Sequence, residues 1–186
     1  VAGIIGAGYG DGGIDGVNPF ATLIGYGYGG TMVAGIFDAQ ALLSDFPDTR
    51  VVNLSVEYAW TRTQTITEAR IARGRRAVSE HAFALELLVL LGAESTLFVS
   101  VSGNGSDKVP AEITSPWNWA GLFSGATNVL VVGSHDPQKA RSSFSNQGQD
   151  IEAPGELILS TVTGGHGIGC GTSMAAPFIS GLAGYL

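Results

Sequence analysis

A serine near the start of a predicted helix is the residue best suited to chemistry in this chain. Ser173 lies in Gly-Thr-Ser-Met-Ala-Ala-Pro, residues 171–177, and small and apolar residues continue to Gly184. Glycine before the serine allows close backbone approach, and the N-terminus of a helix offers N–H groups and positive potential to an anion. This pattern favours an acyl-transfer nucleophile. A lone serine in an apolar helix would instead bond back to the helix carbonyls.

Residues 171–177 resemble the nucleophile motif of the subtilisin-like serine peptidases, the subtilases. The resemblance implies peptide-bond hydrolysis through an acyl-serine intermediate, with Ser173 as the nucleophile. Residues 99–105 resemble the family's strand that ends in the oxyanion-hole asparagine, which would be Asn104. Its side-chain amide and the N–H of Ser173 could donate to an oxygen that is negative only in the tetrahedral intermediate. Alone, an asparagine between two glycines predicts only a turn.

Two further segments resemble the parts of a subtilase that bind the substrate chain. The candidate substrate-binding residues are Ser55, Val56, Glu57, Ser100, Val101, Ser102 and Gly103. The family usually has glycine where this chain has Glu57. A carboxylate there could narrow the first specificity pocket or favour a basic side chain. Because residues 132–134, 141–146 and 153–155 also look like subtilase segments, the resemblance covers nearly the whole chain.

Two positions of the expected catalytic triad hold glycine. Residues 29–35 resemble the family's His-Gly-Thr-x-Val-Ala-Gly motif, so Gly29 stands at the position of the histidine. Residues 4–8 resemble the strand end that carries the aspartate, so Gly6 stands at that position. A serine hydroxyl needs a base to take its proton and an acid to protonate the leaving amine. In subtilisin, a relative, loss of the triad lowers turnover by about 10⁶. We therefore expect very low or no proteolysis.

Other residues leave alternatives open. Of the three histidines His81, His135 and His166, only His166 precedes Ser173 closely enough in sequence to be a candidate substitute base. A histidine of the substrate could also take that role. Cys170 lies where other small residues are usual, and we interpret it as a small packed residue with a partly exposed thiol. The chain could instead be a pseudopeptidase that binds an extended peptide through main-chain hydrogen bonds.

Composition bounds the remaining possibilities. The 186 residues, 45% of them hydrophobic, predict one domain over 1–186, and the chain's ends predict a piece of a longer protein. A net charge of −7 disfavours nucleic acid and anionic membranes, so a polypeptide is the expected partner. We recognise no membrane span, signal peptide, metal-ligand spacing, calcium loop or cofactor motif. Only the resemblance favours a secreted or cell-envelope location.

Alternating segments must position these residues. Continuous apolar runs predict strands over residues 1–6, 51–56, 97–102 and 129–132, and helical spacing predicts helices over 31–43 and 65–91. This alternation predicts an α/β fold with a mainly parallel sheet covered on both faces, and the resemblance implies a three-layer subtilisin-like arrangement. In such folds ligands bind beyond the carboxyl ends of the strands. Gly6, Ser55 and Asn104 fall at or just past those ends.

Overall fold

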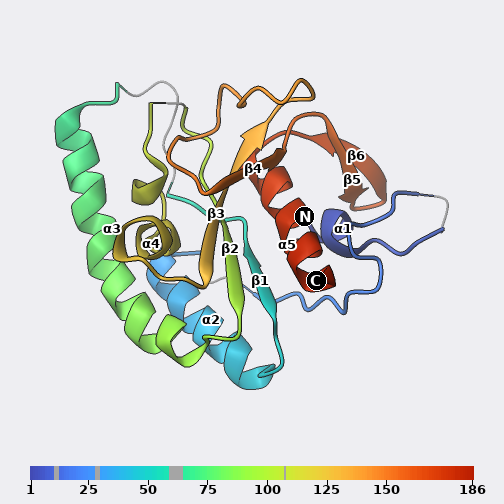
Figure 1. The fold of residues 1–186 in the computed structure, drawn as a ribbon, viewed down its shortest axis with the longest axis horizontal. Coiled ribbons are helices and arrows are strands. Elements are labelled where there is room, and N and C mark those ends of the chain that lie inside the picture. The colour runs from blue at the N-terminus through green and yellow to red at the C-terminus, as the bar shows by residue number, and fades with distance from the viewer. Residues whose placement is uncertain (11–12, 28–29, 59–64, 107) are drawn as a thin grey trace.

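A four-stranded parallel sheet forms the centre of the molecule (Figure 1). The computed structural model describes residues 1–10, 13–27, 30–58, 65–106 and 108–186. The strands are β1 (Val51–Leu54), β2 (Leu97–Val101), β3 (Val129–His135) and β4 (Ile151–Pro154), and they lie in that order in the sheet. All three neighbouring pairs are parallel, so the carboxyl ends of the strands share one edge.

Helices cover both faces of the sheet. One face carries α2 (Met32–Asp45), α3 (Glu68–Leu88) and α4 (Pro116–Trp119), and the other carries α5 (Thr172–Tyr185), as Figure 1 shows. The short helix α1 (Ala2–Gly6) and the hairpin of β5 (Ile158–Val162) and β6 (Gly165–Gly169) lie on the α5 side. Single turns complete the described elements: η1 (Leu90–Gly92), η2 (Ala111–Ile113) and the π-type η3 (Ala120–Ser124). The predicted α/β fold with a mainly parallel sheet is confirmed.

Alternation along β2 divides the core into two clusters. Phe98 packs with Leu85 and Trp117 on the side of α3 and α4, and its ring stacks on that of Trp117 at a centroid distance of 5.0 Å. Val99 points the other way and packs with Val132 and residues of α5. Because successive side chains of a strand face opposite sides, one short strand supplies both clusters.

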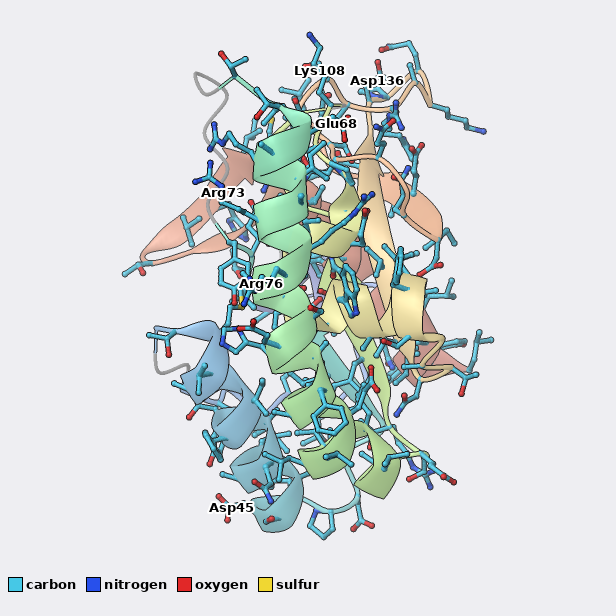
Figure 2. All side chains as sticks on the ribbon, turned by 90° about the vertical axis from the view of Figure 1, so that its left-hand side faces the viewer. Asp45, Glu68, Arg73, Arg76, Lys108 and Asp136 are labelled. Carbon is cyan, nitrogen blue, oxygen red and sulfur yellow. The ribbon has the colours of Figure 1, made fainter. Side chains whose placement is uncertain are left out.

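Side-chain caps fix the starts of the helices on the first face. The hydroxyl of Thr31 accepts from the Ala34 N–H at 3.1 Å, and that of Thr67 accepts from the Arg70 N–H at 3.4 Å. Such caps satisfy N–H groups that have no intrahelical acceptor. The outer face of α3 is charged, with Arg73 and Arg76 exposed to solvent (Figure 2), as expected for a solvated helix face. The helices predicted over 31–43 and 65–91 are confirmed with small shifts of their ends.

The strand predicted over Val1–Gly6 is wrong, because these residues form α1. Periodicity cannot distinguish a short apolar run in a strand from one in a helix. The run is held by close contacts on both sides. A Cβ on Gly3 would clash with Thr161 of β5, and a Cβ on Gly181 of α5 would lie 3.1 Å from the carbonyl oxygen of Ile5. Strand β4, the β5–β6 hairpin and α4 are elements that the apolar runs did not predict.

No helix in the described part of the chain is long and apolar enough to cross a membrane. The described residues also contain no group of three or more histidine, cysteine, aspartate and glutamate side chains that could hold a metal ion.

Candidate active site

Asn104 lies beside the first turn of α5, which carries Ser173, at the carboxyl edge of the sheet. Ser173 is the second residue of α5, and the helix is preceded by Gly171 with φ 146°. Asn104 follows β2, and its Oδ1 accepts from the Thr172 N–H at 2.9 Å and from the Thr172 hydroxyl at 3.2 Å. Asn104 thus supplies the acceptor for the first N–H of the helix. The structure brings these two predicted residues together from positions 69 apart in the sequence.

Glu57 binds the other side of Asn104. The Asn104 side-chain Nδ2 donates to Glu57 Oε1 at 3.0 Å, and the Asn104 backbone N–H donates to Oε2 at 3.0 Å and to Oε1 at 3.2 Å. An ionised carboxylate only accepts hydrogen bonds, so the NH₂ group of Asn104 faces Glu57 and its oxygen faces Thr172. The amide that the sequence predicts as an oxyanion donor is therefore held by a carboxylate.

The environment of Glu57 has two opposing effects on its acidity. Burial raises the pKa of the carboxyl group above its ordinary value, and the two kinds of hydrogen bond from Asn104 lower it; burial is the larger effect. The neighbouring residue Gly103 has φ +103°, and a Cβ there would collide with the Glu57 carboxylate and the Asn146 amide. Glycine at 103 therefore makes room for the contact between Glu57 and Asn104.

Asn146 fixes the turn that carries Asn104. It is fully buried. Its Oδ1 accepts from the N–H groups of Gly105 and Ser106 at 2.9 and 3.0 Å, and its Nδ2 donates to the Ser102 carbonyl at 2.9 Å. Sequence reasoning assigned this residue no role. Its segment resembles the family, but one sequence does not tell a turn-bonding asparagine from a surface one.

The two predicted substrate-binding segments have different surroundings. Ser55, Val56 and Glu57 are half-buried and line an open hollow of about 600 Å³ together with Thr31 and Met32 at the start of α2. In contrast Ser100, Val101, Ser102 and Gly103 are buried. The Ser100 hydroxyl donates to Asn118 Oδ1 at 2.6 Å, and the Ser102 carbonyl accepts from Thr114 and Asn146. Residues 55–57 are therefore accessible to a ligand, whereas residues 100–103 are buried in the interior.

Tyr58, the residue directly after Glu57, is anchored at two points. The Tyr58 N–H donates to the Thr114 carbonyl at 2.6 Å, and the Tyr58 hydroxyl lies 2.8 Å from Nδ1 of His81 on α3. His81 thus has a structural partner near the site, a contact that sequence reasoning did not anticipate. These bonds hold the backbone on which the Glu57 side chain turns toward Asn104.

The remaining candidates lie elsewhere or outside the described residues. Gly6 ends α1, where a Cβ would lie 3.2 Å from the Asn18 carbonyl oxygen, and so it does not sit at a strand end. Gly29 falls outside the described residues. His166 is exposed on β6, with its ring against Gly13. Cys170 is exposed, so its thiol is accessible as expected although the residue itself is not packed, and its Sγ accepts from the Leu157 N–H at 3.3 Å.

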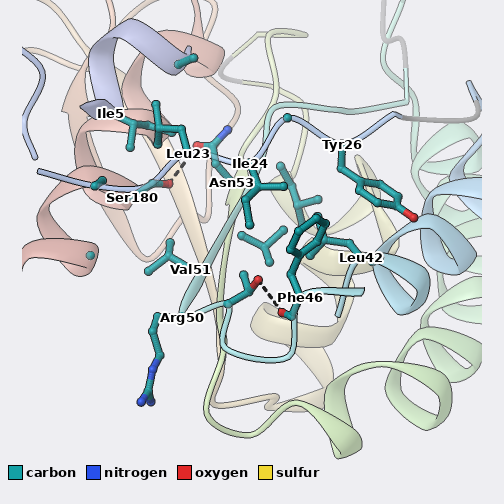
Figure 3. Close-up of a pocket in the computed structure, with 18 of the residues that line it drawn as sticks. Ile5, Leu23, Ile24, Tyr26, Leu42, Phe46, Arg50, Val51, Asn53 and Ser180 are labelled. Atoms are coloured by element: carbon teal, nitrogen blue, oxygen red, sulfur yellow. Dashed lines mark hydrogen bonds between the residues drawn. The ribbon is translucent and has the colours of Figure 1, made fainter. Parts of the chain in front are cut away.

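A larger hollow of about 860 Å³ runs along the outer side of β1 (Figure 3). Apolar side chains such as Leu23, Leu42 and Phe46 line it, and at its side the Ser180 hydroxyl of α5 donates to Asn53 Oδ1 at 2.9 Å. Ser173 and Asn104 do not line this hollow. The hollow is a mainly apolar cleft that does not include the candidate nucleophile.

Known subtilisin-like proteases resemble this chain along nearly its whole length. The family model described as "Subtilase family" matches residues 1–186. Subtilisin-like protease 1 of Trichophyton rubrum is 34% identical over 184 residues, which are 95% of this chain and 34% of that protein. Its counterpart from Trichophyton verrucosum is 33% identical over 95% of this chain and 43% of its own length. The chain therefore spans well under half of the curated relatives that it matches.

Solved structures show the same fold. The crystal structure of MycP1 with the N-terminal propeptide removed matches with a TM-score of 0.61 and 22% identity, over 98% of this chain and 64% of that one. The S218A mutant of the protease domain of PatA matches with a TM-score of 0.59 and 21% identity, over 97% of this chain and 60% of that one. With the family model matching every residue from 1 to 186, this chain belongs to the subtilase family.

Proposed function

We propose that this chain is a subtilisin-like peptidase domain that retains its nucleophile and oxyanion-binding residues but lacks the base that would activate the serine. The observation that carries the proposal is the hydrogen bond from the Thr172 N–H to Asn104 Oδ1 at 2.9 Å. It holds the asparagine beside the first turn of α5, where Ser173 lies. The substrate would be a polypeptide, and its extended backbone would lie along Ser55 to Glu57.

The chemistry follows from the places of these groups. The Ser173 hydroxyl would attack a peptide carbonyl of the substrate. The carbonyl oxygen would then become negative in the tetrahedral intermediate. The N–H of Ser173 has no intrahelical acceptor because it belongs to the first turn of α5, so it is one donor for that oxygen. The Asn104 amide would be the second donor once it is free of Glu57. Positive potential at the helix N-terminus adds to both.

Activation of the serine is the missing part of this mechanism. Gly29 and Gly6 stand in the histidine and aspartate positions by resemblance, and neither can take a proton. Among the described residues, no hydrogen bond joins Ser173 to a histidine. General base catalysis contributes about 10²–10⁴ in rate, so the chain should hydrolyse peptides very slowly or not at all.

The test is hydrolysis of a set of chromogenic peptides, including one with a basic residue before the cleaved bond. We would compare the chain with Ser173→Ala, Gly29→His, and Gly29→His combined with Gly6→Asp. We expect the chain to match Ser173→Ala and the variants with His at 29 to cleave about 10²-fold faster or more. Adding Ser173→Ala to them should abolish that gain. Cleavage by the unaltered chain that depends on Ser173 would contradict the proposal and point to another base, with His166 tested first.

A second candidate function is peptide binding without cleavage. The bond between Glu57 and Asn104 favours it, because a carboxylate held at this amide disfavours a second anionic oxygen there. Calorimetric titration of the same peptides separates the two. Micromolar-range binding, on the order of −8 kcal/mol, by a chain that stays inactive after Gly29→His would favour a pseudopeptidase. Turnover after that change favours the peptidase.

A further inference from the structure

Three polar groups of Asn104 have protein partners, and Nδ2 uses one of its two N–H donors for this. Its oxygen accepts from Thr172, and its backbone N–H and side-chain Nδ2 both donate to Glu57.

Glu57 bonds one N–H of the amide that a negatively charged ligand atom would use, and its charge disfavours a second anionic oxygen at that amide. Its Oε1 lies 3.0 Å from Nδ2, within the distance expected for an amide donor bound to an oxyanion. A ligand oxygen would compete for the same donor and would also be repelled by the carboxylate. Two anionic groups that share one donor in a partly buried site cannot both remain ionised without a large cost.

The side chain has space into which it can move. The open hollow of about 600 Å³ adjoins Glu57, and the described residues that line it carry no other carboxylate and no cation: Gly30, Thr31, Met32, Ser55, Val56, Glu57 and Tyr58. The Tyr58 backbone remains tied to Thr114 in either position. Rotation of the side chain alone would expose the amide and place the carboxylate in a more hydrated site, where ionisation is favoured.

We propose that Glu57 blocks the oxyanion-binding amide of Asn104, so that an anionic ligand atom binds there only after the Glu57 side chain has moved into the hollow. This inference rests on the proposed function, because the ligand is a peptide whose terminal oxygen reaches Asn104. It adds an inhibitory contact within the chain to a site that otherwise retains two oxyanion donors. Its direct consequence is weaker binding of peptide carboxylates than of the matching amides.

Peptide pairs test this consequence without any turnover. In the Ser173→Ala background, we would titrate acetylated tetrapeptides that end in Ala, Leu or Lys, each as the free acid and as the carboxamide. Replacing Glu57 by Gly should tighten binding of the acids by about tenfold or more and leave the amides nearly unchanged. Glu57→Gln removes the charge but keeps an acceptor oxygen, so its gain should be smaller. Glu94→Gln, before β2 at the opposite end of the sheet, is the matched control.

Dependence on Asn104 completes this test. Adding Asn104→Ala to Glu57→Gly should remove the gain for the acids, because the donor is gone. An unchanged ratio of acid to amide affinity in both Glu57 variants would overturn the proposal. If the acids bind equally tightly to Glu57→Gly with and without Asn104→Ala, the proposal also fails. Charge repulsion by Glu57 alone would then explain the gain, without competition for the Asn104 donor.

A readout without peptides separates this inference from the proposed function. The side-chain NH₂ resonances of Asn104, assigned by their loss in Asn104→Ala, should shift in Glu57→Gly and not in Glu94→Gln. If no peptide binds any variant but these resonances shift, the blocking contact stands and peptide binding fails. If the resonances do not move, the amide is not held by Glu57, and the inference fails whatever the peptides do.

Discussion

Burial raises the pKa of Glu57, and hydrogen bonds from Asn104 oppose that shift. A carboxyl group whose pKa is higher in the folded state than in the unfolded state retains its proton better when folded. The folded chain then binds more protons than the unfolded chain, and the free energy of unfolding falls as the pH rises through that interval. The contribution is fully present below the unfolded-state pKa, near 4.5, and is lost as the pH rises through the folded-state pKa.

We therefore expect Glu57→Gln to flatten the stability profile just above pH 4.5. Urea unfolding from about pH 4 to about pH 8 measures this effect. As the pH rises, the free energy of unfolding of Glu57→Gln should increase relative to that of the unaltered chain. Glu94 is exposed, and Glu94→Gln should run parallel to the unaltered chain. If the unaltered chain instead gains stability relative to Glu57→Gln on the alkaline side, the hydrogen bonds outweigh burial and the assigned direction is wrong.

At the scale of single residues, the motif around Ser173 was enough to name the candidate side chains, whose catalytic roles stay predictions. The structure places Asn104 beside Thr172 in the first turn of α5. The contacts of Glu57 and Asn146 were not predictable in the same way. Both depend on backbone turns that bring residues 40 or more positions apart together, and no local pattern encodes a partner at that separation.

Helix α5 depends on glycine where it meets α1. A Cβ at Gly181 would lie 2.7 Å from Val17 Cβ and 3.1 Å from the Ile5 carbonyl oxygen, which belongs to the backbone and cannot rotate away. At Gly184, one turn further on, the nearest atom would be the Asn18 amide at 3.5 Å, an ordinary contact. The two sites lie in one helix and differ in the space around them.

Gly181→Ala should lower the free energy of unfolding by about 1–3 kcal/mol, the usual cost of overpacking a close contact. Gly184→Ala should be neutral or stabilise the chain by up to about 1 kcal/mol, because alanine is the better helix former. Thermal unfolding of both variants measures the difference. Equal effects at the two positions would show that α1 does not pack closely on α5 in solution.

At the scale of elements, the strength of the local signal decided what the sequence could predict. Small or apolar residues at helical spacing marked α2 and α3, and continuous apolar runs marked β1, β2 and β3. Residues 1–6 have the same apolar character, but contacts with β5 and α5 favour a helix there. The β5–β6 hairpin is exposed over most of its length, so it lacks the apolar alternation by which strands are recognised.

The whole molecule is organised around a sheet with a separate apolar cluster on each face. Phe98 and Trp117 belong to one cluster, whereas Val132 belongs to the other. Strand pairing links them, since Phe98 pairs with Val129 and Val101 pairs with Val132 in the same two strands. Loss of packing on one face should therefore be transmitted to the other through shared backbone hydrogen bonds. The candidate site, at the carboxyl edge of these strands, depends on both clusters.

Val132→Ala tests this cooperativity, because it removes two methyl groups from a fully buried position on the side of α5. The expected cost is on the order of 2 kcal/mol, the loss of transferred apolar surface plus a small cavity. We expect the indole resonance of Trp117, on the opposite face, to report the same lowered urea midpoint as far-ultraviolet circular dichroism. Val33→Ala, at an exposed position of α2, should change stability by less than about 0.5 kcal/mol. If Trp117 keeps its original midpoint while the dichroism signal loses amplitude early, the two faces unfold separately, and the site rests on the α5 face alone.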